Sequence, residues 1–195
     1  PRPRSTIRTS RGPRGCTVTP HEAANTTTDP ASAVLERARH FVDDLTLTEV
    51  VRWKKDHPGR LAVGYMPIYV PRPMLEGIGC LPVAMFGGGD QVDIIKGDSF
   101  YQSYICHIPR STLELALNGS LDSLDGVLFP SICDVIRNLS GMWQMLFPEK
   151  YASYVDLPQN FDPELGGKFY VNDMARILRD LTARGAWKYD ADKMR

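Results

Sequence analysis

The 195-residue sequence has no long apolar run and no excess of charge of either sign. A membrane-spanning helix needs roughly 20 consecutive apolar residues, and a secretory signal needs an apolar centre, so neither is indicated. The formal net charge is zero, which argues against a general nucleic-acid binder. We therefore expect a cytoplasmic protein whose partners include no nucleic acid and no membrane.

The sequence also lacks a close pair of cysteines. Its four cysteines lie at positions 16, 80, 106 and 133, a spacing typical neither of a zinc ribbon nor of a small disulfide scaffold. The nucleotide-binding patterns GxGxxG and GxxxxGK are absent as well. Any metal site must therefore be assembled by the fold from distant segments.

Residues 1–29 contain few large apolar side chains. The first fifteen residues carry five arginines and no acid. Such a segment buries too little apolar surface to offset the entropy of ordering it, so we expect a disordered extension rich in Arg, Pro and Thr. An arginine-rich arm that binds RNA or a membrane surface is the alternative.

The rest of the chain predicts an α/β domain. Asp29-Pro30 is a helix start, and two N-terminal helices are expected within residues 30–58. Short apolar runs then alternate with helical patterns, which indicates a parallel sheet with helices on both faces. The expected strands are 61–66, 81–86, 126–129 and 151–157; the expected helices are 73–79, 98–118, 134–147 and 168–184.

Sites in open α/β sheets form at the carboxyl ends of the strands. Cys133 lies there, between the apolar run "GVLF" and the next helix. A helix N-terminus favours a thiolate, which a soft metal or an iron–sulfur cluster requires. A lone cysteine after a strand is nevertheless more often a small core residue. Cys106 falls inside the predicted helix 98–118, where it has the same two interpretations, and Pro109 is expected to distort that helix.

Other polar and glycine-rich positions lie in the same loops. Three consecutive glycines allow a backbone to approach a phosphate, but a plain flexible turn explains them as well. Arg110 has the charge to bind an acidic ligand group or to pair with a carboxylate, and Arg137 has the same two interpretations. Aromatic residues of these segments suit an apolar pocket or the core. The candidates for a substrate or CoA pocket are Tyr65, Pro67, Gly87, Gly88, Gly89, Asp90, Gln91 and Arg110.

Three stretches carry a resemblance to a known family. They are "GYMPIYVPRPMLEGIGCLPVAMFGGGDQ", "GDSFYQSYICHIPRSTLELALNG" and "DGVLFPSICDVIRNLSGMWQMLFP". Together they closely resemble the 2-hydroxyacyl-CoA dehydratase D-component family, in the branch whose members reduce aryl-CoA thioesters. The resemblance runs from about residue 33 to 180, and residues 1–30 lie outside it.

The resemblance implies a protein of two flavodoxin-like lobes that hold a 4Fe–4S cluster between them. Residues 59–165 would form the first lobe, and 166–195 a connecting helix towards a second lobe that lies beyond this sequence. Cys106 and Cys133 would be two of the cluster ligands; neither Cys80 nor Cys16 is carried over as one.

The reaction implied is the reduction of benzoyl-CoA to a cyclic dienoyl-CoA in anaerobic aromatic degradation. Ferredoxin would supply the electrons, and ATP would be hydrolysed by separate activator subunits. A related paired subunit is also implied. The alternatives are dehydration of a 2-hydroxyacyl-CoA by the same family, or an interaction module without a cluster.

Overall fold

The computed structural model describes residues 29–188. The chain divides into two units, Pro1–Arg37 and Ala38–Arg195, and helix α1 (Pro30–Asp43) spans the boundary. As the Asp-Pro pair predicts, α1 begins at Pro30, and the Ala33 N–H donates to the Asp29 carbonyl at 3.1 Å. The predicted extension 1–29 lies, apart from Asp29, outside the described residues. The domain boundaries at 58 and 165 remain predictions.

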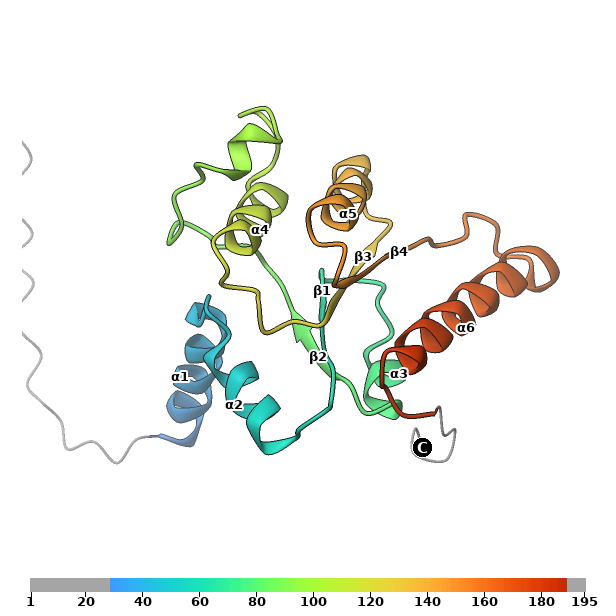
Figure 1. Cartoon of the computed structure of the whole chain (residues 1–195), viewed down its shortest axis with the longest axis horizontal. Coiled ribbons are helices and arrows are strands. Elements are labelled where there is room, and N and C mark those ends of the chain that lie inside the picture. Colours follow the sequence, from blue (N-terminus) through green and yellow to red (C-terminus); the bar gives the residue numbers. More distant parts are fainter. Residues whose placement is uncertain (1–28, 189–195) are drawn as a thin grey trace, which may run out of the picture. The chain divides into compact units, whose positions relative to one another are not determined.

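Four parallel strands form one sheet in the second unit, in the order β2-β1-β3-β4 (Figure 1). Both faces of β1 and β3 are covered, and their residues are buried without interruption, as continuous apolar strands predict. Because the strand order reverses between β1 and β3, a crevice is expected at their carboxyl ends. The flavodoxin-like α/β fold class is thereby confirmed. The strands are β1 (Ala62–Tyr65), β2 (Leu81–Ala84), β3 (Gly126–Pro130) and β4 (Tyr151–Val155).

Helices cover both faces of the sheet (Figure 1). On one face lie α2 (Thr48–Asp56), α4 (His107–Leu117) and α5 (Asp134–Leu146), whose apolar side chains pack with Val127 and Phe129. On the other lie α3 (Arg72–Gly77) and α6 (Lys168–Ala183), which pack against Val63 and Leu128. Alternate residues of β3 thus pack into the cores on opposite faces of the sheet, because side chains alternate along a strand.

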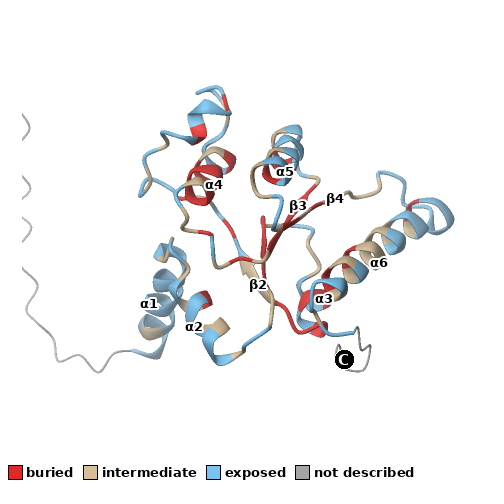
Figure 2. Cartoon of the chain, in the orientation of Figure 1, coloured by how far each residue is buried: buried red, intermediate tan, exposed pale blue. Residues whose placement is uncertain are grey.

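Burial follows these two layers (Figure 2). Strands β1 and β3 and the inward faces of α4 and α5 are buried, whereas β2 is mostly of intermediate exposure and α1 has no buried residue. A single turn of π-helix, η2 (Pro163–Gly167), precedes α6, and its first turn is capped by the Asp162 carboxylate, which accepts from the Glu164 N–H at 2.7 Å. Across residues 29–188, no helix has the length and apolar character needed to cross a membrane.

The one predicted helix that is wrong is 98–118. The structure has a 3₁₀ turn, η1 (Gly97–Ser99), then an irregular segment, and α4 begins only at His107. Pro109 therefore lies in the first turn of α4, where backbone N–H groups have no intrahelical acceptor. It does not distort the helix there, since proline is tolerated in a first turn.

Candidate metal-binding site

Cys106 and Cys133 occupy equivalent positions at the carboxyl end of the sheet. Cys106 is the N-cap residue of α4 and Cys133 is the N-cap residue of α5. Both thiols are free and exposed, so neither is a core residue, and the interpretation of Cys106 as a residue within a helix is wrong. Neither helix start has a side-chain cap, and the first N–H groups of an α-helix have no intrahelical acceptor.

Tyr101 connects the two cysteine-bearing segments. Its side chain is 8% exposed, and its hydroxyl donates to the Val135 carbonyl in the first turn of α5 at 3.3 Å. Burial raises the pKa of Tyr101, and the nearby sulfurs of Cys106 and Cys133 raise it further. Both cysteines therefore lie near the same buried hydroxyl, although they are far apart in sequence.

The glycine run after β2 packs on the start of α4. The Gly88 N–H donates to the hydroxyl of buried Ser111 at 3.0 Å, and this hydroxyl donates to the His107 carbonyl at 2.9 Å. Gly87 has a φ of 77°, and a Cβ there would collide with Ser111 Oγ and approach the Ile108 carbonyl oxygen to 3.0 Å. These contacts explain by packing alone why glycine occupies this position, without a bound phosphate.

The rest of the glycine loop faces outward. Gly89 has a φ of 53° with open space around it, and Asp90 is exposed. The Gln91 side-chain amide donates to the Asp43 carboxylate at 3.2 Å. Their proposed part in a substrate pocket stays a prediction.

Arg110 is engaged in the structure. Its guanidinium donates to Asp98 at 2.8 and 2.5 Å and to the carbonyls of Ser103 and Ile105 at 3.0 and 3.4 Å. Of the two interpretations of Arg110, pairing with a carboxylate is the one observed. The residue braces the segment before Cys106 against α4, and its place in a substrate or CoA pocket stays a prediction.

Glu114 performs a similar task that sequence reasoning missed. Its buried carboxylate accepts from the backbone N–H groups of Ile95 and Gly97 at 3.0 and 2.7 Å. A carboxylate enclosed by apolar residues in "STLELALN" was the available signal, because a buried acid has to find hydrogen-bond donors.

The other predicted pocket residues are the last residue of β1, Tyr65, and Pro67 in the loop that follows. Tyr65 is buried in the core beside α3 and α6, and Pro67 is half-buried. Ile68 and Tyr69 follow with φ values of 76° and 67°, a conformation that costs a non-glycine residue about 1–2 kcal/mol. The loop is thus strained at the crevice end of β1, while the Tyr65 ring belongs to the core.

A cavity of about 640 Å³ lies beside Cys133, between the start of α5 and the segment after β4. Its polar lining includes Arg137, Asp156 and Asn160. The Arg137 guanidinium lies 5.2 Å from the centre of the Tyr154 ring, and a hydrogen bond to Tyr154 raises its pKa. The cavity places a cation and several hydrogen-bonding groups next to one of the two thiols.

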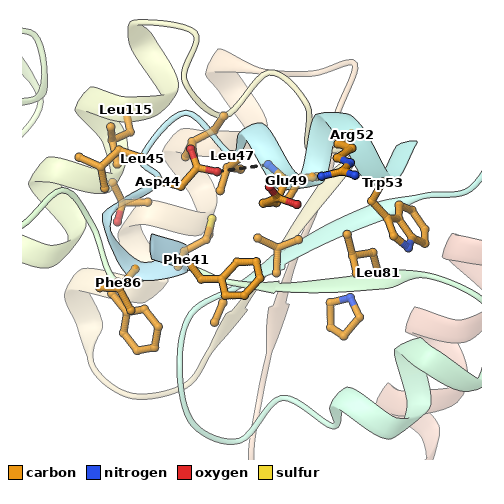
Figure 3. A pocket seen from close by; sticks show the side chains of 18 of the residues that line it. Phe41, Asp44, Leu45, Leu47, Glu49, Arg52, Trp53, Leu81, Phe86 and Leu115 are labelled. Carbon is orange, nitrogen blue, oxygen red and sulfur yellow. Dashed lines mark hydrogen bonds between the residues drawn. The ribbon is translucent and has the colours of Figure 1, made fainter. Parts of the chain in front are cut away.

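A second cavity, of about 670 Å³, is mainly apolar (Figure 3). Its lining includes Phe41, Leu45, Leu47, Leu81 and Phe86, and the side chain of Phe41 lies between those of Phe86 and Leu81 in this view. Gly87 also lines it, as does Thr112, whose buried hydroxyl has no hydrogen-bond partner within residues 29–188. Neither cysteine at the helix N-caps is among its lining residues.

Metal binding by Cys106 and Cys133 stays a prediction. Between residues 29 and 188, no group of three or more His, Cys, Asp or Glu side chains is arranged to hold a metal ion. Two exposed thiols at adjacent helix starts fit a soft metal or an iron–sulfur cluster as a partial ligand set. A cluster bound here would need further ligands from beyond residues 29–188.

Comparison with known proteins finds a family match over the part of the chain that contains Cys106 and Cys133. The profile of the family described as 2-hydroxyglutaryl-CoA dehydratase, D-component, matches residues 67–195. A benzoyl-CoA reductase subunit of Thauera aromatica is 46% identical over 162 residues, which cover 83% of this chain and 42% of that protein. The match includes most of the described fold.

More distant relatives are named as dehydratase subunits. The (R)-phenyllactyl-CoA dehydratase beta subunit of Clostridium sporogenes is 30% identical over 58% of this chain and 30% of its own length. The beta subunit of (R)-2-hydroxyglutaryl-CoA dehydratase from Acidaminococcus fermentans is 30% identical over 47% of this chain and 24% of its own length. The matched part of this chain spans less than half the length of each relative.

Proposed function

This chain belongs to the 2-hydroxyglutaryl-CoA dehydratase D-component family, and we propose that it is part of an iron–sulfur subunit of an enzyme acting on CoA thioesters. The observation that carries the proposal is the pair of exposed thiols at the N-caps of α4 and α5. Cys106 and Cys133 would hold one edge of a 4Fe–4S cluster. The other ligands would come from a second lobe.

The reaction we propose is the reduction of benzoyl-CoA. It adds two electrons and two protons to the aromatic ring and yields a cyclic dienoyl-CoA. This reaction is favoured over dehydration because identity to the benzoyl-CoA reductase subunit is 46%, against 30% for the two dehydratase subunits. Ferredoxin would supply the electrons, and separate activator subunits would hydrolyse ATP. A related paired subunit would complete the enzyme in the cytoplasm.

The cluster would supply single electrons of low potential when bound. The chain's own residues would hold and orient it. Arg110 fixes the approach to Cys106, and the cavity lined by Cys133 and Arg137 gives a thioester access to that edge of the site. This cavity suits the thioester better than the apolar cavity, since Cys133 itself lines it.

Anaerobic spectroscopy tests the proposal on the full-length protein, produced with its paired subunit. Iron and sulfide analysis and low-temperature EPR should report a 4Fe–4S cluster. Cys106→Ser and Cys133→Ser should each remove or strongly alter its signal, while Cys80→Ala should retain it. A colourless protein without iron would favour the interaction module, and an unchanged signal in Cys133→Ser would refute the ligand assignment.

Substrate assays decide between the two family reactions. Consumption of an aryl-CoA with stoichiometric ATP hydrolysis supports reduction. Reversible dehydration of a 2-hydroxyacyl-CoA, with no aryl-CoA consumed, would instead make the protein a dehydratase component.

A further inference from the structure

We propose that Tyr101 is a positioning residue that sets the separation of the Cys106 and Cys133 sulfur atoms. The inference deepens the proposed function, because a shared cluster requires its ligands at a fixed spacing. It concerns the protein's own geometry, however, and can be tested on protein from which iron has been removed.

Tyr101 differs from the aromatic residues around it. It is 8% exposed and belongs to the same core cluster as the apolar residues of α4 and α5, whereas Phe100 is 42% exposed and Tyr104 is 81% exposed. The ring of Tyr101 is thus the one of these three that turns inward from the irregular segment. Its hydroxyl ends at the Val135 carbonyl, two residues after Cys133.

The segment that carries Tyr101 is tied to α4 at several points. Arg110 binds the Asp98 carboxylate and the Ser103 carbonyl. Glu114 accepts from the Gly97 N–H. Since α4 begins directly after Cys106, these bonds make the segment and the Cys106 helix start one rigid piece.

Tyr101 then joins this piece to α5. Val135 lies in the first turn of α5, and the Arg137 N–H donates to the Cys133 carbonyl at 3.2 Å. A path therefore runs from Cys106 through α4 and Arg110 to the segment 98–103, and from Tyr101 of that segment through Val135 to Cys133. The hydrogen bond from the Tyr101 hydroxyl to the Val135 carbonyl connects the segment held by α4 to α5.

The test compares Tyr101→Phe with Tyr104→Phe. Both remove one hydroxyl from the same segment, but only the first removes the bond to Val135. In the full-length complex, freed of iron under anaerobic conditions, a bifunctional thiol reagent is used to cross-link Cys106 to Cys133. Tyr101→Phe should change the cross-linking rate about fivefold, the factor expected for one hydrogen bond, with monofunctional labelling rates unchanged. Tyr104→Phe should leave the cross-linking rate at the wild-type value.

A second variant covers the case in which Tyr101→Phe does not fold. Asp98→Asn weakens the brace through Arg110 and should change the cross-linking rate in the same direction by a smaller factor. After cluster reconstitution, Tyr101→Phe should also shift or broaden the EPR signal. Equal cross-linking rates in wild type, Tyr101→Phe and Asp98→Asn would overturn the inference. Absence of any cluster from the wild type, with the cross-linking effect intact, would instead refute the proposed function alone.

Discussion

At the amino end of the sheet, Cys80 directly precedes β2 and is 4% exposed in the core beside α3 and α6. At the carboxyl end, Cys106 and Cys133 cap two helices and are exposed. Burial raises the pKa of the Cys80 thiol to about 11. The cysteine side chain is thus a buried packing group at the amino end of the sheet, whereas at the carboxyl end its thiol is exposed to solvent.

The two ends are also held together differently. At the amino end, Asp125 accepts from the Lys54 ammonium at 2.8 Å with both oxygens and from the Ala62 N–H at 2.7 Å. This compact arrangement joins α2, β1 and the start of β3. At the carboxyl end, long loops are tied to α4 by individual side chains such as Ser111 and Glu114. The end that carries the thiols therefore has its geometry set by loop contacts, which single substitutions can alter.

The largest expected difference between the two ends is in thiol reactivity. In iron-free native protein, Cys106 and Cys133 should react with a thiol reagent at least about a hundredfold faster than Cys80, which reacts only through local opening of the core. Peptide mass spectrometry assigns the rate to each cysteine. Unfolding in denaturant should bring the three rates close together. Equal rates in the native protein would show that the predicted contrast is wrong.

A smaller effect is expected from the glycine loop. Gly87→Ala should destabilise the protein by about 2–4 kcal/mol, because the new methyl collides with Ser111 at a positive φ. Gly89→Ala is the matched control: it has a positive φ with open space and should cost about 1 kcal/mol. Denaturant unfolding measures both. Equal losses would mean that the contact with α4 contributes nothing.

The smallest effect is the pH dependence due to Cys80. Its pKa is about 11 in the folded state against 9.0 ordinarily, so the unfolded state ionises first as the pH rises. The stability contribution is complete below pH 9 and is lost towards pH 11. Between pH 8 and pH 10, wild type should lose about 1 kcal/mol more than Cys80→Ala. Tyrosine ionisation is common to both proteins, so parallel unfolding curves would contradict the buried environment of Cys80.

Local signals in the sequence predicted most elements well. The Asp29-Pro30 start of α1, the four strands and the helix after Cys133 lie within one or two residues of their predicted limits. The predicted helix 98–118 was wrong in its first part, where the Ser103 and Ile105 carbonyls accept from the Arg110 guanidinium, and the Gly97 N–H just before it donates to the Glu114 carboxylate. Those bonds join residues that no short sequence window relates.

The candidate site was predictable to a lesser degree. A strand followed by a helix start located Cys133, and the resemblance to a family added Cys106. The role of Tyr101 had no such signal, since "SFYQSY" offers two tyrosines of equal character. The reason one is buried at 8% and the other is 81% exposed lies in α5, more than 30 residues away.

Apolar periodicity and helix start signals, which act over a few residues, were enough to specify the parallel α/β architecture. Residue types alone also specified which side chains are able to bind a metal. That Cys80 is packing, that Arg110 is a brace, and that the hydroxyl of Tyr101 lies near both exposed thiols became evident only in the folded chain. Exposure, pairing and electrostatic proximity depend on which distant segments meet, and that follows from the crossing of strands and the packing of helices.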